Sequence, residues 1–112
     1  MQSRSVNLEA LSDNTVAALI DPLTTKLRLN ARESGWPARL IQGLTVAVDD
    51  SHNLYVDYPE ELREDIENME YGDINGLPNA AIRPFMFRAA GLIEDVIRER
   101  TLQDLFIEAG VI

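Results

Sequence analysis

Apolar residues in the first third of the chain recur at steps of three and four, the spacing that places side chains on one face of an α-helix. We therefore expect a long helix over residues 13–33, started by a Ser12 or Asp13 cap and ended at Gly35. Its apolar stripe consists of Val16, Leu19, Ile20, Leu23, Leu27 and Ala31. Pro22 lies within this range and lacks a backbone N–H, which predicts a kink or a restart of the helix.

The pattern changes after Gly43. Two runs rich in β-branched and aromatic residues, 44–48 and 53–58, flank a polar cluster at 49–52. This arrangement predicts an antiparallel hairpin, because alternate residues of a strand point to the same face. The residues expected to share a face are Leu44, Val46 and Val48 in the first strand and Leu54, Val56 and Tyr58 in the second. A short turn of helix, Pro37 to Gln42, is expected before the hairpin.

The second half of the chain has two helical patterns separated by a loop. Pro59 can open a short acidic helix, and the glycines and proline between residues 71 and 81 predict a loop. A second long helix is expected to begin near Pro84, with a stripe of Met86, Ala89 or Ala90, Ile93 and Ile97. Thr101 has the character of a helix cap, which predicts a bend or a new helix there.

These elements predict an α+β fold in which a long N-terminal helix and a C-terminal helix pack on a small antiparallel β-sheet. A chain of 112 residues is long enough for one core and too short for two domains. We therefore expect a single domain over residues 1–112, with a flexible N-terminal tail at 1–12. The longest apolar run, Val16 to Ile20, is far too short to cross a bilayer, so no membrane partner is expected.

The net charge of -9 is concentrated in the middle of the chain. Residues 44–82 hold ten acidic side chains and a single basic one, Arg63. Such a surface repels phosphate backbones, which argues against a domain that grips nucleic acid by itself. Two interpretations stay open, a solvated face that aids solubility and a negative wall that faces DNA.

The sequence contains only weak signals for catalysis or metal binding. Cysteine is absent, and His52 lies in a polar turn without a predicted partner. The acidic residues between 57 and 73 could supply an acid and base pair, but a solvated acidic helix has the same composition. The turn at 49–53 offers oxygen ligands yet lacks the glycine and the distant glutamate of a calcium loop. We expect no catalytic residues, no metal site and no cofactor.

Aromatic residues and arginines gather between residues 70 and 89, and this combination is typical of protein interfaces. Tyr71, Arg83, Phe85 and Arg88 are therefore candidates for contact with another subunit. A structural explanation is also open, in which the aromatic residues close the core, Gly72 makes a turn with positive φ and Pro84 starts a helix.

The same segment resembles the tail-completion or neck proteins of long-tailed bacteriophages, small proteins that join the head to the tail. The residues that carry the resemblance are Glu70-Tyr71-Gly72 and Arg83-Pro84-Phe85 leading into Arg88-Ala89. The order of a long first helix, an antiparallel sheet and a Pro-Phe helix start agrees over nearly the whole chain. This chain differs in having a helix between the hairpin and the Glu-Tyr-Gly step.

The resemblance implies a structural virion protein without enzymatic activity. It would be assembled in the cytoplasm of a bacterial host and form a homo-oligomeric ring, a hexamer, that joins the head connector to the tail and lines the DNA channel. The partners implied are identical copies, a connector or stopper protein, and a tail terminator or tail tube protein, with DNA passing through without specific binding. The interface residues would be Tyr71, Gly72, Arg83, Phe85 and Arg88.

The acidic residues allow a further hypothesis and an alternative. Glu60, Glu61, Glu64 and Asp65 would form an acidic face toward the channel, where like charge keeps DNA from adhering. The alternative function is an acidic module that mimics DNA or inhibits a basic partner, and it depends on the charge of the middle third alone.

Overall fold

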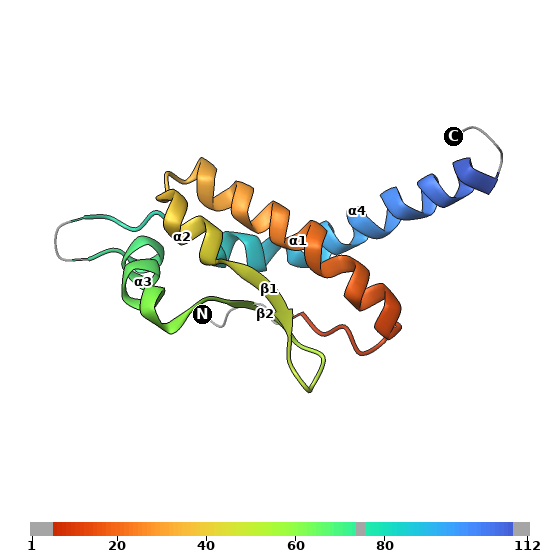
Figure 1. Cartoon of the computed structure of the whole chain (residues 1–112), viewed down its shortest axis with the longest axis horizontal. Coiled ribbons are helices and arrows are strands. Elements are labelled where there is room, and N and C mark those ends of the chain that lie inside the picture. The colour runs from red at the N-terminus through yellow and green to blue at the C-terminus, as the bar shows by residue number, and fades with distance from the viewer. Residues whose placement is uncertain (1–5, 74–75, 109–112) are drawn as a thin grey trace.

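The computed structural model describes residues 6–73 and 76–108, with side chains described as far as Leu102. The elements follow in the order α1 (Asp13–Glu33), α2 (Ala38–Gly43), β1 (Thr45–Val48), β2 (Leu54–Asp57), the 3-10 turn η1 (Glu60–Leu62), α3 (Arg63–Tyr71) and α4 (Ile82–Glu108). Helix α1 packs against both β1 and α4, and one core joins the helices to the hairpin (Figure 1). The α+β fold expected from the sequence is confirmed.

Helix α1 has the predicted bounds and the predicted cap. Ser12 Oγ accepts a hydrogen bond from the Thr15 backbone N–H at 3.2 Å. At the other end Gly35 has a φ of 85°, and the Trp36 N–H donates to the Ala31 carbonyl, which is the glycine-ended helix stop known as the Schellman motif. The helix continues through Pro22 without a restart. Its buried residues are Leu19, Leu23, Leu27 and Ala31.

The hairpin is antiparallel and pairs Val46 with Val56 and Val48 with Leu54. Its apolar face packs toward α1, as the alternation predicted. Helix α1 also covers the outer edge of β1, because Thr24 Oγ1 accepts from the Val46 N–H at 3.1 Å. Arg28 donates through Nε to the Leu44 carbonyl at 2.9 Å. These bonds satisfy backbone groups that an edge strand would otherwise expose.

The N-terminal segment differs from the flexible tail that the sequence suggested for residues 1–12. Residues 1–5 lie outside the described part of the chain. From Val6 onward the chain runs beside the start of β2, where the Leu54 N–H donates to the Val6 carbonyl at 2.8 Å and the Leu8 N–H to the His52 carbonyl at 2.7 Å. Val6 and Leu8 are buried in the core. Burial of these apolar side chains and pairing of the backbone hold the segment in place.

Helix α4 begins at Ile82, close to the predicted start near Pro84, so that Pro84 is its third residue. It continues to Glu108, so no new helix starts at Thr101. Thr101 Oγ1 donates to the Ile97 carbonyl one turn earlier, at 2.9 Å. A hydroxyl engaged backward in this way does not cap a new helix.

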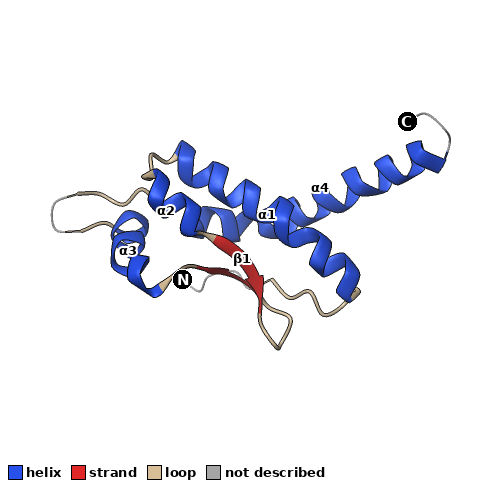
Figure 2. Ribbon diagram, in the orientation of Figure 1, coloured by secondary structure: helices blue, strands red, loops and turns tan. Residues whose placement is uncertain are grey.

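The buried face of α4 overlaps the predicted stripe. Ala89 and Ile93 are buried as expected, Phe85 and Val96 are buried beside them, and Met86 and Ile97 are partly buried against the same core. The C-terminal turns of α4 project away from the rest of the molecule, as Figure 2 shows.

Candidate functional site

The carboxylate of Glu70 joins α3 to the start of α4. The Glu70 side chain is only 2% exposed, and its oxygens accept hydrogen bonds from the backbone N–H groups of Ala81 at 2.8 Å, Ile82 at 2.7 Å and Arg83 at 2.9 Å. A carboxylate at this end of a helix is also favoured by the helix dipole. Glu70 therefore acts as the N-terminal cap of α4 although it lies eleven residues before Ala81 in the sequence.

The local sequence explains why α4 needs this cap. The residue before the helix is Ala81, which has no side-chain oxygen to accept from the first N–H groups. Pro84 at the third position has no N–H to satisfy, and the Phe85 N–H begins the helical pattern by donating to the Ala81 carbonyl at 3.1 Å. The donors that remain are those that Glu70 accepts.

Arg83 also links α3 to the start of α4, through its side chain. Its Nε donates to Glu70 Oε2 at 2.9 Å and its Nη2 donates to the Glu70 backbone carbonyl. The guanidinium lies over the ring of Tyr71, 4.4 Å from the ring centroid, where a cation and an aromatic face attract. The Arg83 side chain is nevertheless 49% exposed. Arg83 thus has a structural role and an accessible surface at once.

Gly72 makes the turn that follows α3. Its φ is 85°, and a Cβ added there would lie 3.0 Å from both the Gly76 carbonyl oxygen and the Pro78 nitrogen. The loop returns to α4 through Asn79, whose N–H donates to the Met69 carbonyl and whose carbonyl accepts from Trp36 Nε1, each at 2.7 Å. The structural explanation weighed for Gly72 is therefore confirmed, and the loop is fixed at both ends.

An exposed surface lies over these fixed residues. We call it the arginine-aromatic patch and define it as Tyr71, Arg83, Pro84, Phe87 and Arg88. Tyr71 is 61% exposed and Phe87 is 67% exposed. A hollow of about 460 Å³ is lined by Ala80 and by four members of the patch, Arg83, Pro84, Phe87 and Arg88.

Arg88 borders the hollow on the side of α1. Its Nη2 donates to Asn30 Oδ1 at 3.2 Å, and its Nε donates to the Pro84 carbonyl at 3.4 Å. Both acceptors are neutral oxygen atoms, so these hydrogen bonds leave the positive charge of Arg88 uncompensated. The patch therefore combines accessible aromatic surface with positive charge.

Phe85 does not belong to this surface. Its side chain is 1% exposed and lies in the core, so the interface role expected for it is wrong and the core role is correct. The reason is the direction in which α4 faces α1, which turns Phe85 inward and leaves Phe87, two residues further, outside. Tyr71, Arg83 and Arg88 remain accessible candidates.

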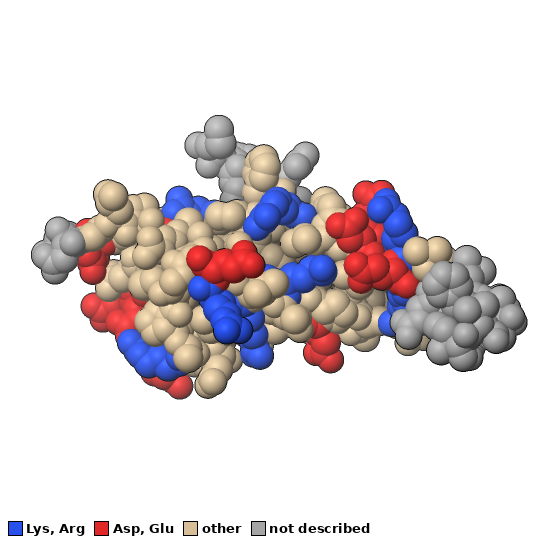
Figure 3. All heavy atoms as spheres, turned by 90° about the horizontal axis from the view of Figure 1, so that it is seen from above, with Lys and Arg blue, Asp and Glu red and all other residues tan. Residues whose placement is uncertain are grey.

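The four acidic residues expected to form one face are distributed over η1 and the start of α3. Glu60, Glu61 and Glu64 are exposed, whereas Asp65 is partly covered. Two of the four are paired within the chain, because Asp65 lies 2.6 Å from Arg39 and Glu60 lies 2.7 Å from Arg63. On the face seen in Figure 3, acidic and basic side chains lie side by side among uncharged ones.

Two side chains near this acidic segment, Arg63 and Tyr58, have raised pKa values. The hydrogen bond and the charge of Glu60 raise the pKa of the exposed Arg63. Burial, followed by the negative charge of Glu67, raises the pKa of Tyr58 above its ordinary value. Neither group is poised to transfer a proton near neutral pH.

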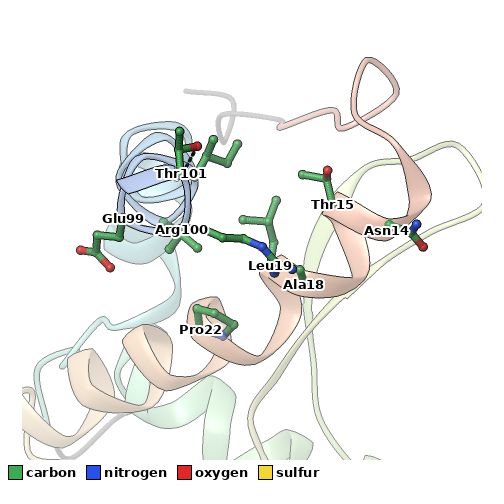
Figure 4. Close-up of a pocket in the computed structure, with 10 residues that line it drawn as sticks. Asn14, Thr15, Ala18, Leu19, Pro22, Glu99, Arg100 and Thr101 are labelled. Atoms are coloured by element: carbon green, nitrogen blue, oxygen red, sulfur yellow. Dashed lines mark hydrogen bonds between the residues drawn. The ribbon is translucent and has the colours of Figure 1, made fainter. Parts of the chain in front are cut away.

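A second hollow lies between the N-terminal half of α1 and the C-terminal half of α4 (Figure 4). Its volume is about 490 Å³, and its charged lining residues are Glu99 and Arg100. Thr101 lies beside them, but its hydroxyl donates to the Ile97 carbonyl. The Thr101 hydroxyl is therefore engaged with a backbone carbonyl and is not hydrogen-bonded to a base that could activate it as a nucleophile.

Among the described residues, no cluster of three or more His, Asp or Glu side chains is arranged to hold a metal ion. No helix in the same part of the chain combines the length and the apolar character needed to cross a bilayer. His52 lies in the hairpin turn with a φ of 66°.

Sequence reasoning missed two residues of this site. Glu70 belongs to the Glu70-Tyr71-Gly72 step, but its role as a helix cap is not predicted by the sequence pattern. The absence of a capping side chain at Ala81 is a signal that the helix start needs an acceptor from elsewhere. The sequence does not show that Phe87 is exposed and Phe85 is buried, because this depends on which side of α4 packs against α1.

No family model, curated protein or solved structure matches this chain.

Proposed function

We propose that this protein is a structural subunit of a tailed bacteriophage that assembles with copies of itself into a ring at the neck, between the head connector and the tail. The observation that carries the proposal is the arginine-aromatic patch. Aromatic and arginine side chains that are exposed on a braced surface are typical of residues that dominate binding at protein interfaces.

The rigidity of the patch supports a docking role. Glu70 fixes the backbone at the start of α4 through three N–H groups, and Arg83 is held between Glu70 and Tyr71. Binding by a surface that is already ordered loses less conformational entropy than binding by a mobile loop. The residues of the resemblance, Glu70-Tyr71-Gly72 and Arg83-Pro84, meet in this one unit, which supports the neck assignment.

The ring sets requirements for each subunit. A closed ring with rotational symmetry needs two different faces on every copy, each accepting the other. We infer a hexamer whose outer partners are a connector or stopper protein on the head side and a tail terminator or tube protein on the other side. In the mature particle the protein is part of the virion, and it has no catalytic role.

The acidic face is assigned to the DNA channel. Glu61 and Glu64 are exposed and would repel the phosphate backbone during passage, whereas Glu60 and Asp65 contribute less because each is paired with an arginine. At physiological salt this repulsion reaches about 8 Å, so it acts only where DNA passes close to the wall.

The first test is the oligomeric state. Light scattering over a range of concentrations, with and without a purified connector protein, should detect a defined ring, and electron microscopy of negatively stained samples should show its central opening. A protein that stays monomeric in the presence of the connector would contradict the proposal. Competition with DNA for a basic protein at low salt, lost as salt rises, would instead favour the DNA-mimic function.

A further inference from the structure

We propose that the hollow of the arginine-aromatic patch receives the acidic hairpin turn of a second copy of this chain, residues 49–52, with Asp50 opposite Arg88. The inference rests on the proposed ring and names the contact that would join neighbouring subunits. The charges of the two surfaces are opposite, with Arg88 in the hollow and the exposed Asp49 and Asp50 in the turn.

The hollow provides the positive side of the contact. It is a shallow, open depression of about 460 Å³ that an exposed turn can approach. Arg88 stands at the rim with its charge uncompensated by its hydrogen bonds to Asn30 and Pro84. Phe87 and Pro84 supply apolar walls that exclude water around a charged pair, and exclusion of water strengthens the attraction between the charges.

The hairpin turn provides the convex and negative side. Asp49 Oδ1 accepts from the backbone N–H groups of Ser51 and Asn53, both at 2.9 Å, so the side chain of Asp49 organises the turn. Asp50 is exposed beside it. The turn lies at the free end of the hairpin (Figure 2), which makes it accessible to another molecule.

The N-terminal segment makes this turn rigid. Asn7 Nδ2 donates to the Ser51 carbonyl at 3.0 Å and to Asn53 Oδ1 at 2.9 Å. The Leu8 N–H donates to the carbonyl of His52 at 2.7 Å. A turn braced from outside the hairpin is already in one conformation before it docks, which lowers the entropic cost of binding.

The proposed contact joins two copies. Within one chain Arg88 bonds to Asn30 and Pro84, whereas the turn bonds to the N-terminal segment. Figure 1 shows the hairpin turn projecting away from α4. Each copy carries the hollow of the arginine-aromatic patch and the hairpin turn on different elements, and such a contact is repeated from copy to copy until the ring closes. It leaves the acidic residues of η1 and α3 free to face the channel.

Charge reversal in pairs tests the contact. Arg88→Glu and Asp50→Lys are each expected to weaken self-association by about tenfold or more, because each places like charges opposite one another. Arg88→Glu/Asp50→Lys in one chain should restore assembly. An equimolar mixture of the two single variants should restore it too, since every contact in an alternating ring then joins opposite charges. Analytical ultracentrifugation measures all four cases.

Matched controls separate this contact from general effects of charge and folding. Arg32→Glu changes an exposed arginine of α1 outside the hollow and should assemble as the wild type does. Circular dichroism should show that each variant is folded. Phe87→Ala should weaken association, and adding Asp50→Lys should not restore it.

Failure of the hairpin contact and failure of the proposed ring function give different results. Single variants that assemble like the wild type, or a mixture that does not regain assembly, would overturn the hairpin contact while a wild-type ring leaves the proposed function intact. A wild-type chain that forms no ring even with its connector would overturn the proposed function itself.

Discussion

Glu70 and Arg83 hold each other through both their side chains and their backbones. The Glu70 carboxylate accepts from the N–H and from the Nε of Arg83, while Arg83 Nη2 donates to the backbone carbonyl of Glu70. This reciprocal pair determines how α4 meets α3, and it places Arg83 over Tyr71. The geometry of the arginine-aromatic patch therefore depends on a carboxylate that is itself hidden from solvent.

Replacing Glu70 should destabilise the protein strongly. Glu70→Gln removes the charge that three backbone N–H groups and Arg83 share, and its amide N–H₂ group would face donors in place of an acceptor. We expect the free energy of unfolding to fall by about 3 kcal/mol. Urea denaturation followed by circular dichroism measures the change. Glu67→Gln, on the exposed face of the same helix, is the matched control and should change stability by about 0.5 kcal/mol or less. Equal midpoints for the two variants would contradict the assigned role.

Two glycines should respond to alanine in opposite directions. Gly72→Ala introduces a Cβ at a φ of 85° and 3.0 Å from two backbone atoms, so we expect a loss of about 1–3 kcal/mol. Gly91 lies within α4 with nothing within 4 Å of an added Cβ, and Gly91→Ala should stabilise by about 1 kcal/mol through helix propensity. Thermal unfolding of both variants tests the difference in sign.

Alanine substitutions at Phe85 and Phe87 should change different properties, the first the folding stability and the second the assembly of the ring. Phe85→Ala opens a cavity in the core and should cost about 3–5 kcal/mol of folding free energy. Phe87→Ala removes an exposed ring, so its unfolding midpoint should stay close to that of the wild type while ring formation weakens. Denaturation and light scattering on the same samples give both quantities. A Phe87→Ala protein that assembles normally would remove Phe87 from the interface.

Stability should fall in alkaline solution because of Tyr58. Burial raises the pKa of its phenol above the ordinary 10.0, so the folded state holds the proton more tightly than the unfolded state does. This contribution is present below the ordinary pKa and is lost as pH rises through the folded pKa. Unfolding midpoints between about pH 8 and about pH 11 should decline in the wild type and decline less in Tyr58→Phe. Identical slopes would contradict this assignment.

The local elements could be anticipated because their signals lie within a few residues. The spacing of Leu19, Leu23 and Leu27 indicated α1, and a serine oxygen one residue before the helix indicated its start. The alternation in 44–48 and 53–58 indicated the hairpin for the same reason. Backbone geometry alone fixes these periods, so no knowledge of distant residues is required.

The cap and the buried side of α4 could not be anticipated in the same way. The cap, Glu70, comes from another helix, and the choice between Phe85 and Phe87 depends on which side of α4 faces α1. The same holds for Asn7, which bonds to Asn53 46 residues away. Such partners are selected by packing, which brings distant segments together only once the core has formed.

The amino-acid sequence by itself determined the two long helices, the hairpin and the concentration of negative charge, because each arises from the order of neighbouring residues. The tertiary structure decided which carboxylate is buried, which phenylalanine is exposed and where the arginines gather. Burial and electrostatic pairing depend on distances across the fold, and those distances exist only after α1, α3 and α4 have packed together.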